Sequence, residues 1–261
     1  MKKEIAINVQ SLQKSFGDNK VLNEISLSIE KGSSLVIIGP SGAGKSVLIK
    51  TIIGLIQPDS GNIFIDGIET TNISINQKFE MMKKYGFLFQ NGGLFDSLTV
   101  QENITFLAEK IYNLSKQDKE ALAIEKLASV RLPDTVLHLY PSELSGGMQK
   151  RVGIARAICT NPDILFFDDP TSGLDPIATN LINELIIKIH KELNTTIISI
   201  THNMDSAYKI ADEVALIHRG RLLWKGKKAK MKVTDNPYMH QFINGLAAGE
   251  VNLNSIEFDS T

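Results

Sequence analysis

The sequence predicts an α/β fold built around a parallel sheet, and three observations support that prediction. Apolar runs of strand length recur along the 261-residue chain, and helical stretches separate the later ones. Residues 34–38 and 164–167 are apolar almost throughout, as expected for strands covered on both faces. Each of these two runs leads directly into residues of the kind that bind ligands at the carboxyl edge of such a sheet.

The expected elements follow in order along the chain. Strands are expected first, at residues 5–9, 25–29 and 34–38. A helix over residues 45–55, a strand over 61–67 ending in an Asp-Gly turn and a strand over 85–90 come next. The spacing is helical from residue 100 to about 130, which predicts an all-helical insertion. The remaining expected elements are helix 146–159, strand 164–167, helix 176–193, strand 195–200 and a hairpin of residues 214–218 and 222–225 turning at Arg219-Gly220.

Composition limits the classes of function. The chain has 28 Lys and Arg against 29 Asp and Glu, so there is no chain-wide basic footprint and we expect no nucleic-acid partner. No apolar run approaches 18 residues, and residues 4–8 alternate like a strand instead of forming the apolar core of a signal peptide. A cytoplasmic protein is expected. The one cysteine, Cys159, lies in an apolar helical stretch and is interpreted as a buried thiol.

A phosphate-binding loop follows the apolar run of residues 34–38. The pattern G-x-x-x-x-G-K-[ST] is complete in Gly39-Pro40-Ser41-Gly42-Ala43-Gly44-Lys45-Ser46. Glycines allow the backbone N–H groups and the next helix N-terminus to surround phosphates. Lys45 is expected to hold the β and γ phosphates, and the Ser46 hydroxyl to bind Mg²⁺. With Val47, this loop forms the expected nucleotide site.

Two carboxylates follow the second apolar run. Asp168 and Asp169 come directly after residues 164–167, at the edge where ligands bind. Asp168 suits magnesium, usually through water, and Asp169 suits polarisation of the water that attacks the γ phosphate. The alternative is that both carboxylates only cap the next turn.

The segment Leu144-Ser145-Gly146-Gly147-Met148-Gln149-Lys150-Arg151 resembles the signature of the ABC ATPase family, and the resemblance covers about residues 5 to 227. It implies a P-loop NTPase fold with a RecA-like parallel sheet core, an N-terminal antiparallel β subdomain and an α-helical subdomain. An ABC ATPase domain is expected over residues 1–230, with the helical subdomain inserted at about 91–160, and a C-terminal helix and polar tail over 231–261.

The resemblance also implies roles for residues outside the two motifs above. Phe16 corresponds to the aromatic residue that stacks on adenine, and Gln90 to the glutamine that contacts Mg²⁺ and senses the membrane partner. His202 corresponds to the switch histidine on the γ phosphate, and residues 172–175 match the D-loop. Three of these residues also have a plain structural reading: Phe16 as a loop aromatic, Gln90 as a loop polar residue and His202 as a core histidine.

The signature implies a second copy of the chain. Ser145, Gly146 and Gly147 at a helix start form an anion site, and Gln149 belongs to the same expected site. In the family this site meets the γ phosphate bound by the opposite subunit of a head-to-tail dimer. ATP and Mg²⁺ are therefore the expected cofactors, and Lys45, Asp169 and His202 the expected catalytic residues.

Asp169 departs from the family pattern, which has glutamate at this position. A carboxylate one methylene shorter changes hydrogen-bond reach, and a misplacement of about 1 Å can cost about 10²-fold in rate. We expect slow but real hydrolysis. The alternative is a nucleotide-gated clamp with little turnover.

Two stretches resemble the ATPases of Mla-type and Mce-linked lipid transporters: residues 89–100 around Gln90, and residues 237–249 near the chain end. That subfamily implies phospholipid movement between envelope membranes, maintaining outer-membrane lipid asymmetry. It also implies an Mla-type permease, an Mce-domain lipid-binding protein and an optional small accessory subunit. The chain would lie peripherally on the cytoplasmic face of the inner membrane, with Leu94 and Phe95 as candidate permease contacts. The alternatives are an ATPase of another ABC importer or exporter, or an ABC ATPase of DNA repair or translation.

Overall fold

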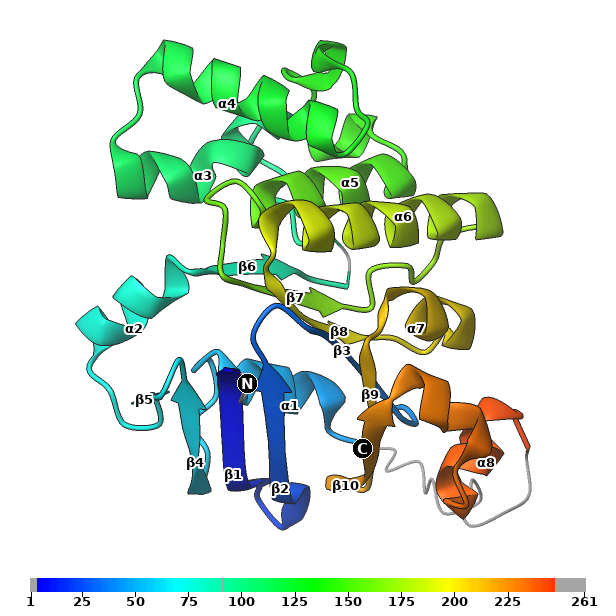
Figure 1. Ribbon diagram of the computed structural model, residues 1–261. Helices are drawn as coiled ribbons and strands as arrows, with labels where there is room; N and C mark the ends of the chain where they lie inside the picture. Colours follow the sequence, from blue (N-terminus) through cyan, green and yellow to red (C-terminus); the bar gives the residue numbers. More distant parts are fainter. Residues whose placement is uncertain (1–3, 91, 247–261) are drawn as a thin grey trace.

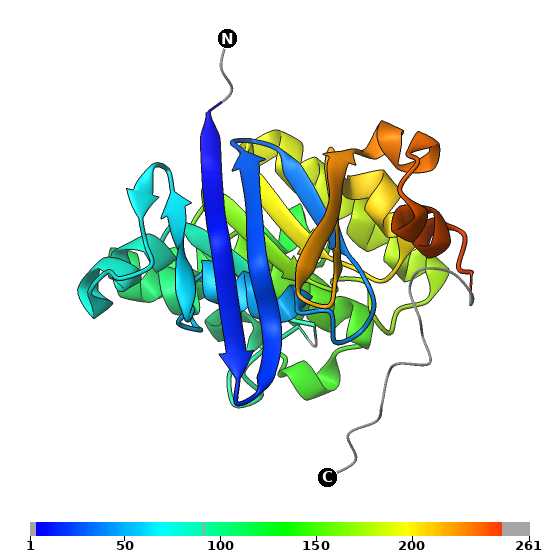
Figure 2. The same ribbon diagram turned by 90° about the horizontal axis from the view of Figure 1, so that it is seen from below.

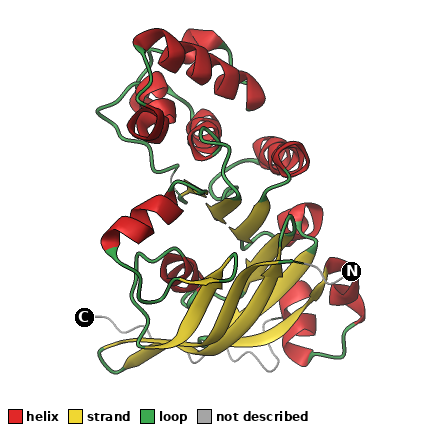
Figure 3. Ribbon diagram, turned by 60° about the vertical axis from the view of Figure 1, so that its left-hand side comes forward, coloured by secondary structure: helices red, strands yellow, loops and turns green. Residues whose placement is uncertain are grey.

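The computed structural model describes residues 4–90 and 92–246. Two sheets form the lower part of the molecule, and a group of helices lies above them (Figure 1, Figure 3). Asn91, residues 247–249 of the lipid-transporter-like ending and the polar tail expected after them lie outside the described residues.

The strands and helices alternate along most of the chain. The strands are β1 (Ile5–Phe16), β2 (Asn19–Glu30), β3 (Ser34–Ile38), β4 (Ser60–Ile65), β5 (Ile68–Glu69), β6 (Tyr85–Leu88), β7 (Ile164–Asp168), β8 (Thr196–Ile200), β9 (Glu213–His218) and β10 (Arg221–Lys227). The α-helices are α1 (Lys45–Ile52), α2 (Ile75–Met82), α3 (Val100–Tyr112), α4 (Lys116–Ser129), α5 (Gly146–Ala157), α6 (Pro176–Leu193), α7 (Met204–Ile210) and α8 (Pro237–Ile243). Three short 3₁₀ helices complete the described elements: η1 (Asp134–Val136), η2 (Pro141–Glu143) and η3 (Lys228–Val233).

The larger sheet determines where a ligand can bind. Its strand order is β10-β9-β3-β8-β7-β6, and every neighbouring pair except β9 and β10 is parallel. Both β3 and β8 are buried along their whole length, as expected for strands covered on both faces. The carboxyl ends of β3, β6, β7 and β8 therefore lie along one edge. The phosphate-binding loop, Gln90, the two carboxylates and His202 follow these four strands.

The smaller sheet is antiparallel, with the order β2-β1-β4-β5. Its long strands β1 and β2 cross the whole molecule when it is viewed from below (Figure 2). Helix α1 contributes Leu48, Ile49 and Ile52 to a core shared with both sheets, so the sheets enclose this helix. The phosphate-binding loop therefore leads into a helix that is packed between the two sheets.

The helical part stands over the β6 and β7 side of the larger sheet. Helices α3, α4 and α5 pack on one another there, and α6 lies beside α5 (Figure 1). Their buried residues join a second core that extends to Met239 of α8. Helix α8, which lies within the C-terminal segment expected to be helical, thus packs on its own domain.

Several boundaries differ from the sequence prediction. Strands β1 and β2 continue past the apolar segments because their polar ends pair as a bulged antiparallel ribbon. Helix α1 ends at Ile52 and not at residue 55, because Gly54 adopts a left-handed conformation at φ 81°. Helix α2 was not predicted, since none of its residues is buried and no core-facing periodicity marks it. The hairpin of β9 and β10 is confirmed.

Candidate functional site

A cavity of about 410 Å³ opens at the carboxyl edge of the larger sheet, and we call it the phosphate cavity. It lies where four parallel strands end, so residues from distant parts of the sequence meet there. Its lining consists of Val21, Ser41, Gly42, Ala43, Gly44, Lys45, Ser46, Val47, Gln90, Asp168, Asp169, Ile200 and His202.

The loop before α1 depends on glycine for close backbone contacts. A Cβ on Gly39 would lie 2.0 Å from the carbonyl oxygen of Ile217, and one on Gly44 would lie 2.6 Å from that of Val21. Gly44 is also the N-cap of α1, with φ at 96°, a conformation that L side chains rarely adopt. The loop is therefore held between β2 and β9, and the N-terminus of α1 opens into the phosphate cavity.

Lys45 is buried at 5% exposure, with its ammonium held inside the loop. The Nζ atom donates to the carbonyl oxygens of Gly39 at 2.8 Å and Pro40 at 2.7 Å. Burial lowers the pKa of Lys45 to about 8, although Asp169 and Asp168 act in the opposite direction. This ammonium would gain from an anionic ligand.

Ser46 and Asp168 are neighbours in the lining of the phosphate cavity. The Ser46 hydroxyl donates to Oδ1 of Asp168 at 3.3 Å. Burial raises the pKa of Asp168, and the Ser46 hydrogen bond and the charge of Lys50 partly offset that rise. Such oxygen groups, with the amide of Gln90 in the same cavity, are the donors that a hard cation prefers.

Asp169 has an unusual backbone conformation. Its φ is 50°, in the left-handed region that Asp tolerates better than most non-glycine residues. Its N–H donates to the carbonyl oxygen of Ile200 at 3.0 Å, and the Thr201 hydroxyl donates to Oδ1 at 3.4 Å. Both partners lie at the end of β8, so the neighbouring strand orients the carboxylate.

His202 lies opposite the loop, in the same cavity. Burial lowers its pKa, and the charge of Lys45 lowers it further, while Asp169 and Asp168 oppose the shift. These shifts favour the neutral imidazole over the imidazolium, and its one ring N–H can donate a hydrogen bond to a phosphate oxygen.

The signature residues line a different cavity. It has a volume of about 340 Å³, and its lining is Ser145, Gly146, Gly147, Arg151, Gly173, Leu174, Asp175, Ala178, Leu181 and Ile182. Ser145 is the N-cap of α5, and its hydroxyl oxygen accepts from the Met148 N–H at 3.3 Å. The signature cavity and the phosphate cavity share no lining residue. Ser145 therefore does not complete the phosphate cavity of its own chain.

Some of the residues expected to contact nucleotide do not line the phosphate cavity of this chain. Gln149 donates to the carbonyl oxygens of Pro141 at 2.9 Å and Leu144 at 3.3 Å, so its amide braces the preceding turn. Phe16 is half-exposed at the end of β1, and the Lys14 ammonium lies 5.4 Å from its ring centroid. Gly39 and Pro40 contribute backbone support beneath the cavity.

The sequence reading missed two residues around Asp169. Thr201 contacts the carboxylate directly, and its place between β8 and His202 was the available signal. Lys150 donates to the carbonyl oxygen of Gln90, although it lies within the signature segment and was assigned no role.

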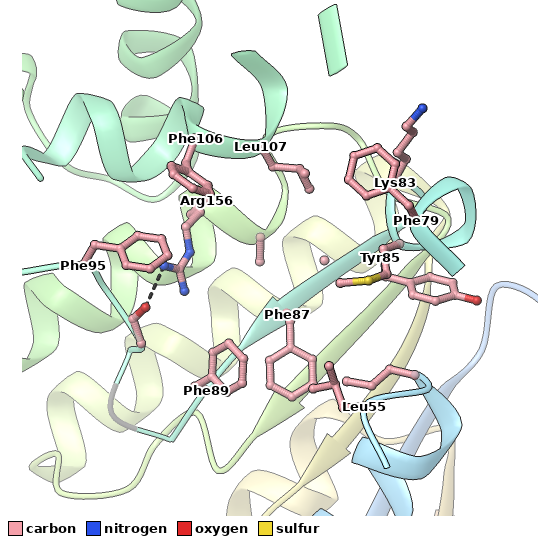
Figure 4. A pocket seen from close by; sticks show the side chains of 15 residues that line it. Leu55, Phe79, Lys83, Tyr85, Phe87, Phe89, Phe95, Phe106, Leu107 and Arg156 are labelled. Atoms are coloured by element: carbon pink, nitrogen blue, oxygen red, sulfur yellow. Dashed lines mark hydrogen bonds between the residues drawn. The ribbon is translucent and has the colours of Figure 1, made fainter. Parts of the chain in front are cut away.

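A third cavity, of about 480 Å³, opens near Gln90 between the helical part and the larger sheet (Figure 4). We call it the aromatic groove. Six aromatic residues line it: Phe79, Tyr85, Phe87, Phe89, Phe95 and Phe106. Four of them are between 38% and 46% exposed, which is a large apolar area to leave in contact with water. Phe87 of the groove floor is partly buried against the core.

Arg156 connects the aromatic groove to the loop after Gln90. Its guanidinium donates to the carbonyl oxygens of Gly93 at 2.7 Å and Gly92 at 3.2 Å, and lies 5.8 Å from the Phe95 ring centroid (Figure 4). Of the two expected permease contacts, Phe95 lines the groove, whereas Leu94 is half-buried against the core.

Within residues 4–90 and 92–246, no helix is long and apolar enough to span a membrane. Over the same ranges, no three or more His, Cys, Asp or Glu side chains group as a metal site. Cys159 is buried, and burial raises the pKa of its thiol to about 11, in agreement with a structural role.

Comparison with known proteins places this geometry in a family. The family model for ABC transporters matches residues 22–172. The probable ribonucleotide transport ATP-binding protein mkl of Mycobacterium leprae is 35% identical over 98% of this chain and 74% of its own length. The Arabidopsis thaliana protein trigalactosyldiacylglycerol 3, chloroplastic, is 32% identical over 95% of this chain and 76% of its own length. A methionine import ATP-binding protein of Carboxydothermus hydrogenoformans is 40% identical over 89% and 68%.

Solved structures agree. The dimeric structure of a bacterial ABC transporter cassette has a TM-score of 0.80 and 30% identity, covering 85% of this chain and 98% of the other. A dimeric post-hydrolysis state of an ATP-binding cassette with ADP and phosphate bound has a TM-score of 0.79. The predicted P-loop NTPase fold is confirmed. The chain belongs to the ABC transporter family and is an ATPase that uses ATP with Mg²⁺.

Proposed function

We propose that this chain is the ATPase subunit of a transporter that moves phospholipid between the membranes of the cell envelope. The observation that supports a transport motor best is the position of one loop. Gln90 lines the phosphate cavity, and the residues beside it, Phe89 and Gly93, line the aromatic groove. A partner seated in the groove would therefore touch the loop that reaches the nucleotide.

The phosphate cavity supports a division of roles in ATP hydrolysis. Lys45 holds the β and γ phosphates as a fixed positive charge. Asp169 would orient the attacking water, because this residue is only 8% exposed and lines the phosphate cavity with Lys45. His202, neutral and in the same cavity, hydrogen-bonds the γ phosphate.

The donor set also fits magnesium. Ser46, Asp168 and Gln90 supply only oxygen ligands, and the phosphates and water complete a magnesium shell in such sites. The small number of protein carboxylates agrees with the way Mg²⁺ is usually held at phosphate sites. Bound there, the ion would neutralise charge on the phosphates.

The separate signature cavity supports a head-to-tail dimer. Ser145, Gly146 and Gly147 present a helix N-terminus that contacts no phosphate cavity of their own chain. We propose that they close the phosphate cavity of a second copy. Ile177, 85% exposed at the start of α6 beside the signature cavity, is an apolar residue that such a dimer would cover.

The aromatic groove is the proposed docking site of an Mla-type permease. Its occupant would be a cytoplasmic helix with apolar side chains, since the groove offers phenylalanine rings with two cations, Lys83 and Arg156, at its wall. The ATPase would then lie peripherally on the cytoplasmic face of the inner membrane. An Mce-domain protein, and in some systems a small accessory subunit, would complete the complex.

Phospholipid as the cargo rests on two resemblances. Residues 89–100 and 237–249 resemble Mla-type and Mce-linked ATPases, and one relative is named after a galactolipid. Ribonucleotide and methionine are the competing cargoes, because one relative is named for ribonucleotide transport and another for methionine import.

A transfer assay on the whole complex tests the cargo. The complex is purified from native membranes through this subunit and reconstituted in proteoliposomes with fluorescent phospholipid. ATP-dependent phospholipid transfer that disappears in Asp169→Asn is expected. ATP-dependent uptake of methionine or of ribonucleotide by the same vesicles, with no lipid transfer, would contradict the lipid proposal and leave the ATPase assignment intact.

A further inference from the structure

One face of α5 is fastened to the loop that follows β6. Lys150 donates to the carbonyl oxygen of Gln90, and Arg156 donates to those of Gly92 and Gly93. Gly153 lies between these two cations on the helix. A Cβ there would lie 2.9 Å from the Gly92 carbonyl oxygen, so the helix and the loop are in direct backbone contact.

Lys150 has a second set of partners on the catalytic side. Its Nζ donates to the carbonyl oxygen of Asp169 at 3.4 Å and to the Ser172 hydroxyl at 3.3 Å. The side chain is 5% exposed. A buried ammonium is costly unless acceptors replace its water, and three acceptors from two loops do so here. Burial lowers the pKa of Lys150, and the Asp169 and Asp168 charges oppose that shift.

The Asp169 backbone requires such support. Its φ of 50° lies in the left-handed region, which is strained for most L residues and less so for Asp. Its carbonyl accepts from the Ser172 N–H at 3.2 Å as well as from Lys150. Because the Asp side chain is short, the direction of the carboxylate depends mainly on this backbone.

We infer that Lys150 is a positioning residue for ATP hydrolysis. Its buried ammonium connects the signature helix α5, the Gln90 loop and the Asp169 backbone. A displacement of α5, or of the loop after β6 that lines the aromatic groove, therefore shifts the Asp169 carboxylate. Lys150 does not line the phosphate cavity itself. The inference rests on the proposed role of Asp169 in orienting the attacking water.

The test uses the ATPase within its permease complex. Lys150→Met keeps the apolar stem and removes all three hydrogen bonds. The expected kcat falls by about 10- to 100-fold, because a misplacement of about 1 Å at the reacting atoms has effects of that size. The Kd for ATP stays within about twofold, and Lys150→Arg recovers kcat to within about threefold of the wild type, since it restores the buried cation.

Lys126→Met is the matched control. Lys126 is also 5% exposed and donates to the Asn161 side chain at 2.9 Å, away from the Gln90 loop and Asp169. Both substitutions bury a neutral chain in place of an ammonium, so they should change the melting temperature to a similar extent. Only Lys150→Met should change kcat.

The outcomes separate the inference from the proposed function. An unchanged kcat in Lys150→Met, beside an inactive Asp169→Asn, would overturn the inference alone. A loss of kcat in Lys150→Met that only follows the loss of folded protein, with no rescue by Lys150→Arg, would also overturn it. An unaffected Asp169→Asn would overturn the proposed role of Asp169 instead. If Lys150→Met does not fold, Lys150→Gln, which keeps one donor, is expected to show the same kcat defect with retained ATP binding.

Discussion

The phosphate cavity and the aromatic groove flank the same loop, yet they are built in different ways. The phosphate cavity consists of short motifs at strand ends, with buried charges and left-handed glycines. The groove consists of aromatic side chains from α2, β6, α3 and the loops around Gln90, with no two in a fixed motif spacing. Chemistry that needs a definite backbone leaves a sequence signature. A surface for a partner helix needs only area and shape, which many sequences supply.

Removing the Asp169 carboxylate from the phosphate cavity is the sharpest test of this contrast. Asp169→Asn is expected to reduce ATP hydrolysis by at least about 10²-fold, because the amide cannot polarise water as a carboxylate does. ATP binding, measured by equilibrium titration, should remain. A rate equal to that of the wild type would show that another group activates the water.

Charging the groove should produce the opposite pattern. Phe89→Glu with Phe95→Glu places two carboxylates among aromatic rings, and permease-stimulated hydrolysis should fall to the basal rate. The basal rate and the Kd for ATP should change by less than about threefold, since neither residue lines the phosphate cavity. Tyr112→Glu is the control, because Tyr112 is also an exposed aromatic of the helical part but lies outside the groove. Retained stimulation in the double variant would exclude the groove as the docking site.

The pH dependence of ATP binding probes Lys45. The pKa of about 8 in the free protein lies below 10.5, so nucleotide-free folding stability should rise from pH 8 to 10.5 as the buried ammonium becomes neutral. Bound triphosphate favours the charged form. The Kd for ATP should therefore be constant below about pH 8 and rise by up to about tenfold per pH unit above it. Lys45→Arg should remove this slope, because guanidinium does not titrate there.

The smallest expected effect concerns adenine. Phe16→Ala should weaken ATP binding by about three- to tenfold, which corresponds to the roughly 0.5–1.5 kcal/mol of an aromatic stacking contact. The same substitution should leave kcat at saturating ATP unchanged. A Kd equal to that of the wild type would favour the plain loop-aromatic reading of this residue.

Sequence patterns predicted the parallel sheet well, for a physical reason. Residues 34–38 and 164–167 are buried on both faces, so their composition alone indicates parallel strands. Helix α2 and the polar halves of β1 and β2 left no such mark, because they bury little.

The site was predictable where a residue type has few alternative uses. Lys45, Ser46 and Asp168 meet as their motif implies. Gln149 was included on motif membership alone; in this chain its amide donates to the Pro141 carbonyl oxygen, and its expected role stays a prediction. Lys150 and Phe106 could not be placed from sequence, since their neighbours come from segments up to tens of residues away.

The close approach of Gly39 to Ile217 has a practical consequence. The Gly220 N–H also donates to the Ala43 carbonyl oxygen at 3.2 Å, so the turn between β9 and β10 contacts the backbone of the phosphate-binding loop. Every motif of the enzyme ends before that turn begins. A truncated version stopping soon after His202 would keep the residues of the motifs and lose β9 and β10, whose backbone contacts the nucleotide loop.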